Sequence, residues 1–106
     1  MTGLVDNLRA MLASGQDNAL LRFSLGSALL KDGDAAGAVE HLAEALRQDP
    51  GYSAAWKLYG KALQAAGDRQ AAAGAFEQGI MVAGSKGDKQ AAKEMAVFLR
   101  RLRRDG

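Results

Sequence analysis

Apolar residues recur along the chain at the three- and four-residue spacing that is typical of amphipathic α-helices. The stretch 19–32 carries such a stripe, and so do the stretches 35–48, 54–66 and 69–83. Glycine–aspartate pairs and one proline separate these stretches, and such residues end one helix and cap the next. The pattern therefore predicts consecutive helices that are joined by short turns.

The predicted helices form two copies of one unit. Residues 19–52 align with residues 53–86 without a gap, at a spacing of 34 residues. Six positions are identical in the two copies: Gly26/Gly60, Ala28/Ala62, Leu29/Leu63, Gly33/Gly67, Asp34/Asp68 and Ala38/Ala72. Five of the six fall on turn residues and small residues, where backbone geometry and close packing restrict the choice. Two helices per copy predict a stack of helix pairs with one continuous core.

Individual residues of the repeat lead to more local expectations. Asn18 and Ser53 stand directly before an apolar stripe, where an N-cap residue is expected. The turn glycines should take the left-handed conformation, and the aspartate after each should cap the following helix. Gly26 and Gly60 lie inside predicted helices, where glycine costs about 1 kcal/mol relative to alanine. We therefore expect the paired helix to approach closely at these two positions.

The segments on either side of the repeats extend the same plan. Three apolar residues of segment 2–14 stand 34 positions before residues of the first repeat, so that Leu4, Leu8 and Met11 correspond to Ala38, Leu42 and Ala45. This helix is interpreted as the second half of a preceding unit. The apolar stripe of segment 88–104 does not keep the repeat's signature, so this helix is interpreted as a cap on the last unit. The sequence thus predicts about six helices in a single domain, residues 1–106.

At these positions the chain resembles the tetratricopeptide repeat family, whose unit is 34 residues long. The second copy matches the family signature at Trp56, Tyr59, Gly60, Leu63, Ala72, Phe76 and Gly79. The first copy matches it at Leu25, Gly26, Leu29, Ala38, Leu42, Ala45 and Pro50. Arg22 replaces the usual aromatic residue at the Trp56 position, and Gly84 stands where the first copy has Pro50. The resemblance implies an all-α fold of antiparallel helix-turn-helix repeats, stacked as a short right-handed superhelix (α-solenoid).

The resemblance also implies a protein–protein interaction module, an adaptor that holds a partner segment on the concave face of the two repeats. The ligand-facing positions of the family map here to Leu20, Phe23, Ser27, Leu30 and Lys31 in the first repeat, and to Ala54, Lys57, Lys61 and Gln64 in the second. Some family members bind carboxylate termini through a clamp of lysine and asparagine. Ser27 and Lys61 stand at the asparagine positions, so that clamp is not supported.

Lys57 and Lys61 lie one helical turn apart and therefore point the same way. Two ammonium groups on one face could bind a carboxylate of an acidic side chain or of a chain terminus. The alternative is that both are ordinary solvated lysines. Likewise, the N-terminal helix or a second copy of the chain could cover Leu20, Phe23 and Leu30, so self-association is an alternative to a foreign partner.

Charge is distributed unevenly and suggests a second hypothesis. Residues 1–52 carry four basic and seven acidic side chains, a net charge of −3, whereas residues 53–106 carry ten basic and five acidic side chains, a net charge of +5. Much of the basic excess lies in the last turns, at Arg100, Arg101, Arg103 and Arg104. These arginines could contact phosphates of nucleic acid or of an anionic membrane. A solubilising helix end is the preferred explanation, because cations are favoured at a helix C-terminus and no aromatic residues are interleaved for base stacking.

The remaining composition argues against an enzyme. The chain has no cysteine and one histidine, His41, so no metal site of histidines and cysteines can form. No nucleophile elbow, phosphate-binding loop or dinucleotide fingerprint occurs. We therefore expect no catalysis, no cofactor and no metal; a deep polar pocket around His41 would revive an enzyme hypothesis. No apolar run reaches the length of a membrane span, and a cytoplasmic location is the expectation.

Overall fold

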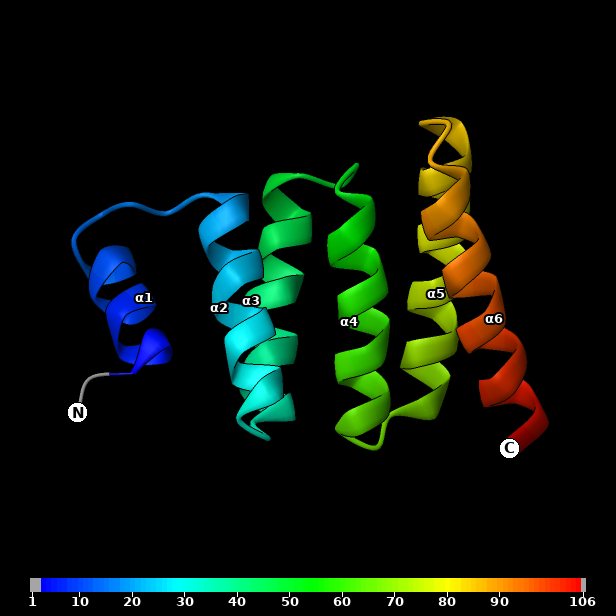
Figure 1. Ribbon diagram of the computed structural model, residues 1–106, viewed down its shortest axis with the longest axis horizontal. Coiled ribbons are helices and arrows are strands. Elements are labelled where there is room, and N and C mark those ends of the chain that lie inside the picture. Colours follow the sequence, from blue (N-terminus) through cyan, green and yellow to red (C-terminus); the bar gives the residue numbers. More distant parts are fainter. Residues whose placement is uncertain (1–2, 106) are drawn as a thin grey trace.

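The computed structural model describes residues 3–105, and these residues form six α-helices and no strand (Figure 1). The helices are α1 (Leu4–Ala13), α2 (Ala19–Lys31), α3 (Ala35–Gln48), α4 (Ser53–Ala65), α5 (Arg69–Ser85) and α6 (Lys89–Asp105). Each helix packs on its neighbours in the sequence, and the array extends over 41 Å in its longest direction. The predicted all-α stack of about six helices is confirmed.

Caps and turns follow the sequence closely at most positions. The side chain of Asn18 accepts a hydrogen bond from the Leu21 amide at 2.8 Å, and Asp34 caps α3 in the same way through Gly37 at 2.9 Å. Gly33 and Gly67 have φ angles of 86° and 90°, the left-handed conformation expected at these turns. The local signals therefore specify where most helices begin and end.

Two helix ends differ from the prediction. The N-cap of α4 is Tyr52, whose carbonyl accepts a hydrogen bond from the Trp56 amide, so Ser53 is already helical and buried. The prediction that Ser53 caps this helix is wrong. Helix α5 continues to Ser85, because Gly84 stays helical and the chain first takes a positive φ at Gly87. Thr2, the expected start of the first helix, lies outside the described residues.

The glycines inside the helices mark points of close approach. A Cβ atom on Gly26 would lie 2.6 Å from Cγ of Leu42, and one on Gly60 would collide with the ring of Phe76. Leu42 and Phe76 are fully buried and occupy the same position in the two repeats. The expected close packing at Gly26 and Gly60 is confirmed, and each glycine lets the first helix of its unit lie against the second.

Two connected clusters of apolar side chains form the core. One centres on Leu25 and Leu42, and the other on Phe76 and Met95. Helix α6 contributes to the second cluster with a buried stripe, which consists of Ala91, Met95, Leu99 and Leu102. This stripe covers α5 and closes the core at one end. Within the described residues, no helix is long and apolar enough to cross a membrane.

Candidate partner-binding face

The first helices of the units line up on one face of the molecule. Helix α4 contacts both α2 and α6, so these three helices lie side by side (Figure 1). In the sequence, α3 separates α2 from α4, and α5 separates α4 from α6. We call this surface the first-helix face. The nine ligand-facing positions expected from the resemblance lie on α2 and α4, and α6 adds Glu94, Phe98 and Arg101.

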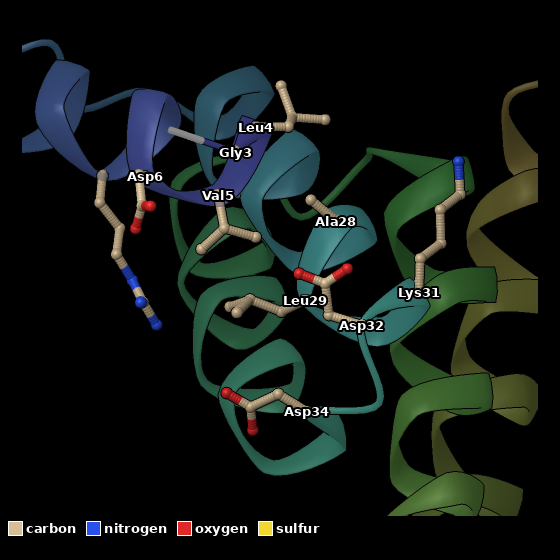
Figure 2. A pocket seen from close by; sticks show the side chains of 10 residues that line it. Gly3, Leu4, Val5, Asp6, Ala28, Leu29, Lys31, Asp32 and Asp34 are labelled. Atoms are coloured by element: carbon tan, nitrogen blue, oxygen red, sulfur yellow. The ribbon is translucent and has the colours of Figure 1, made fainter. Parts of the chain in front are cut away.

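The part of the face on α2 is largely apolar. Phe23 is partly buried and packs on Tyr52, with ring centroids 4.9 Å apart. Leu30 and Ser27 are also partly buried, whereas Leu20 is 65% exposed. Helix α1 therefore leaves Leu20 open to solvent. At the other end of α2, Lys31 is exposed and lines a surface pocket of about 550 Å³ beside α1 (Figure 2).

The part of the face on α4 and α6 is charged. The Lys57 ammonium lies 3.0 Å from a carboxylate oxygen of Glu94 on α6. The Lys61 ammonium lies 5.3 Å from the ring centroid of Phe98, a cation–π contact. A shallow pocket of about 420 Å³ follows, lined by Lys61, Gln64, Ala65, Phe98, Arg101 and Asp105.

Lys57 and Lys61, which the sequence places on one side of a helix, have different surroundings in the structure. Glu94 already offers Lys57 a counter-charge, whereas Lys61 has no carboxylate within ion-pair distance among residues 3–105. Arg101 on α6 also makes no ion pair within that range and opens onto the same pocket as Lys61. The cations available to a ligand are therefore Lys61 and Arg101 rather than Lys57 and Lys61.

The sequence prediction did not include the contribution of α6 to this face. A strict spacing of 34 residues aligns Glu94 with Gly26 and Gly60. This alignment hides the correspondence between α6 and the first helices α2 and α4. Asp88 caps α6 through the Ala91 amide at 3.1 Å. Counted from this cap, Ala96 is the eighth residue of its helix, as Gly26 and Gly60 are of theirs. The cap residue Asp88 was thus the sequence signal from which the alignment of α6 with α2 and α4 could have been predicted.

The basic end of α6 is partly neutralised by the protein itself. Arg103 pairs with Glu77 on α5, and Arg104 lies 3.8 Å from Asp105. Arg69 donates a hydrogen bond to the Leu102 carbonyl and so ties α5 to the last turns of α6. Arg100 and Arg101 are exposed and form no ion pair among the described residues.

His41 belongs to a polar cluster between α2 and α3. Its Nδ1 lies 3.1 Å from Nη1 of Arg22, and Arg22 also binds both carboxylate oxygens of Asp17 at 2.8 and 2.9 Å. In the second repeat, Trp56 stands at the position of Arg22 and donates to the Pro50 carbonyl at 2.8 Å. Arg22 and Trp56 thus both tie their helix to the preceding linker. No surface pocket that we find is lined by His41, and no metal-binding group of acidic, histidine or cysteine residues occurs between residues 3 and 105.

This cluster predicts a pH dependence of stability. Burial, followed by the charge of Arg22, lowers the pKa of His41 below its usual 6.5. The folded protein therefore favours the neutral imidazole, and this contribution is complete above pH 6.5 and lost as the pH falls through the lowered pKa. A His41→Gln variant should lose less stability than the wild type between pH 7.5 and 5.5. Urea unfolding at several pH values measures this difference, and equal losses in both proteins would contradict it.

The carboxylates of the same region do not interfere with that measurement. A hydrogen bond from Arg47 lowers the pKa of Glu44 from 4.5 to about 2, and hydrogen bonds from Arg22 and Gln48 lower the pKa of Asp17 well below its usual range. Both groups therefore stay ionised between pH 7.5 and 5.5 in the folded protein. Their own contribution to stability is lost only at more acidic pH.

Comparison with known proteins gives the fold its family. A family model described as "Tetratricopeptide repeat" matches residues 29–93, more than half of the chain. The TPR repeat-containing protein PA0015 of Pseudomonas aeruginosa is 58% identical over 101 residues, which is 95% of this chain and 96% of that protein. The solution structure of protein BPP2914 from Bordetella parapertussis is 50% identical and superposes with a TM-score of 0.87, covering 99% of this chain and 91% of that one. The chain therefore belongs to the tetratricopeptide repeat family.

Proposed function

We propose that this protein is an adaptor whose first-helix face binds an extended or helical segment of a partner protein. Tetratricopeptide repeats are generally protein-interaction modules. The observation that carries the proposal is the combination of an apolar strip on α2 with available cations on α4 and α6. Leu20 and Phe23 supply apolar contact, and Lys61 and Arg101 supply charge. The segment that fits has apolar side chains followed by an acidic group.

The shape of the face supports a ligand that lies across several helices. The pocket of about 420 Å³ between α4 and α6 can take a side chain or two of a bound segment. Its walls come from two helices, and the apolar strip begins one helix away. A segment that crosses α2, α4 and α6 contacts both regions at once. Because this face spans only two full units, we expect moderate or weak affinity.

A peptide selection tests the proposal with a matched pair of substitutions. Leu20→Glu and Met81→Glu introduce the same charge at side chains that are 65% and 69% exposed, the first on the first-helix face and the second on α5. Peptides displayed on phage are selected with the wild-type protein, and their affinities are measured by fluorescence polarisation. Leu20→Glu and Lys61→Glu should each weaken binding about tenfold or more, because central contacts dominate interface energies. Met81→Glu should leave binding unchanged.

The outcome separates the binding faces. Loss of affinity in Met81→Glu with full affinity in Leu20→Glu and Lys61→Glu would place the ligand elsewhere and refute the proposal. Selected peptides should also be enriched in acidic residues if Lys61 and Arg101 bind them. The hypothesis of nucleic acid or membrane binding through the basic end of α6 predicts instead that no peptide is enriched and that the protein is retained on heparin at low salt.

A further inference from the structure

Among residues 3–105, the stack has half a unit on each side. Helices α2 and α3 form one complete unit, and α4 and α5 form the next. Helix α1 precedes them in the place of a second helix, and α6 follows them in the place of a first helix; the two lie at opposite ends of the array (Figure 1). Among residues 3–105, α1 contacts only α2, and α6 contacts only α4 and α5. Each end helix therefore lacks the partner that would complete its unit.

Two of the three apolar residues on the face of α1 that would meet a first helix are exposed. Leu4, Leu8 and Met11 correspond by the 34-residue spacing to Ala38, Leu42 and Ala45 of α3. The three α3 residues are 0% exposed, whereas Leu4 is 64% and Met11 is 41% exposed; Leu8 is 9% exposed because it packs in one cluster with Leu21 and Leu25 of α2. Gly26 of α2 receives the Leu42 side chain within the complete unit. The exposed edge of α1 is thus an apolar surface of the kind that a first helix covers in both complete units, where α2 covers α3 and α4 covers α5.

Helix α6 has the matching feature of a first helix. Its eighth residue is Ala96, the position at which Gly26 and Gly60 receive the second helices of their units. Ala96 and the fourth residue, Ala92, are small and partly exposed. The fourth residue is Arg22 in α2 and Trp56 in α4, so α6 presents a smoother surface than either. A helix with larger apolar side chains, such as Leu4 and Met11, fits against it.

The charges of the two ends are complementary. In a complete unit the C-terminal end of the first helix lies next to the N-terminal end of the second, across the turn. The C-terminal end of α6 carries the exposed Arg100 and Arg104. The N-terminal end of α1 lies beside the turn between α2 and α3, where Asp6, Asp32 and Asp34 line one pocket together with Arg9 and Lys31, so that acidic groups exceed basic ones by one (Figure 2). The edge formed by Leu4 and Met11 itself contains no charge that would oppose contact.

We propose that α6 of one copy pairs with α1 of a second copy and that the two form a composite repeat unit. Leu4 and Met11 of the second copy then lie against Ala92 and Ala96, while Leu8 stays in the apolar cluster of its own copy. The Cβ atom of Ala96 keeps these two helices further apart than α2 and α3 are at Gly26. The first-helix face continues from α6 into α2 of the next copy, so the surface available to a partner becomes longer. Because the two contacting surfaces differ, the contact leaves a free end on each side and adds copies in a row.

We expect the contact between α6 and α1 to be weak, because its area is small. One helix pair buries less than the ~800 Å² per partner of a standard stable interface, so we expect association mainly between ~50 µM and ~1 mM protein. Opposite charges at the two ends make association stronger at low salt. Sedimentation equilibrium should show a molar mass that rises with concentration in this range and rises less at high salt.

Two complementary variants test the direction of the contact. Leu4→Lys/Met11→Lys blocks the α1 end, and Ala96→Lys blocks the α6 end. Each variant alone should stay monomeric up to ~1 mM, because it has only one functional end. An equimolar mixture should form a 1:1 dimer and nothing larger, since the two remaining functional ends can pair only once. Met81→Lys, which changes an exposed side chain on α5, should associate like the wild type.

Other outcomes would overturn the proposal. A wild type that stays monomeric at ~1 mM and low salt excludes the contact. Dimers that persist in Ala96→Lys but not in Leu4→Lys/Met11→Lys indicate a symmetric contact of α1 with α1, and association of both variants indicates another surface. Circular dichroism checks that each variant is folded. If Ala96→Lys is not, Arg100→Glu/Arg104→Glu replaces it in the same mixing experiment, since both side chains are exposed.

Discussion

A Phe76→Ala variant should lose about 3–5 kcal/mol of the free energy of unfolding, the range for removing a fully buried phenylalanine. Phe76 on α5 is 0% exposed and lies against Gly60 of α4. Its ring centroid is also 5.7 Å from that of Phe98 on α6. One side chain therefore joins three helices, and alanine would leave a cavity where the second unit meets the C-terminal helix. We expect α5 and α6 to separate from the rest of the stack at lower urea concentrations.

The measurement is urea unfolding followed by circular dichroism. Met81→Ala is the matched control, because Met81 lies on the same helix but is 69% exposed, and its loss should change stability by no more than about 0.5 kcal/mol. A loss below about 1.5 kcal/mol in Phe76→Ala would mean that the neighbouring side chains collapse into the space. That result would contradict the rigid packing between α4, α5 and α6 described above.

Replacing glycine by alanine should have opposite effects at two helical positions. Alanine gains about 1 kcal/mol of helix propensity at either position. At Gly74 of α5, an added Cβ meets nothing within 4 Å, so Gly74→Ala should stabilise the protein by about 0.5–1 kcal/mol. At Gly60 the same methyl group collides with the ring of Phe76, which is fully buried and cannot move freely. Gly60→Ala should therefore cost about 1–3 kcal/mol net, as overpacking does.

A double-mutant cycle isolates the cause. If the ring of Phe76 opposes the new methyl group, Gly60→Ala should be less harmful, or even favourable, in a Phe76→Leu background. Equal costs in both backgrounds would point to a different obstacle at Gly60. Stabilisation by Gly60→Ala in the wild type would show that the second helix can shift, and the close approach would then not be a requirement of the fold.

The repeat plan is readable from sequence because its signals are local. Asn18 and Asp34 cap helices through amides three residues away, and Gly33 ends a helix by its own backbone freedom. Such signals act within a few residues and do not depend on the rest of the chain. The prediction failed where a local signal competed with tertiary packing. Ser53 is a good N-cap residue, yet it is buried as the first helical residue because the preceding turn makes Tyr52 the N-cap of α4.

Only part of the candidate site could be predicted from the sequence, for the same reason. The resemblance gave the positions on α2 and α4, and the sequence placed Lys57 and Lys61 on one side of a helix. It could not show that Glu94 pairs with Lys57 or that Lys61 lies over Phe98, since these contacts join residues 37 positions apart in each case. Contacts across such distances depend on how α6 is placed against α4. The longer α5 shifts α6 out of the 34-residue register and thereby decides which residues of α6 reach the face.

The sequence by itself determined the unit, the number of helices, most of their caps and the positions of close approach, because helix periodicity and turn chemistry are properties of short segments. The tertiary structure alone decided which charges are neutralised within the protein, which apolar residues remain exposed at α1, and which surface α6 adds to α2 and α4. These properties depend on the positions of atoms from separate helices. The functional proposals rest on that second group, because a binding surface consists of the charges and apolar atoms that packing leaves free.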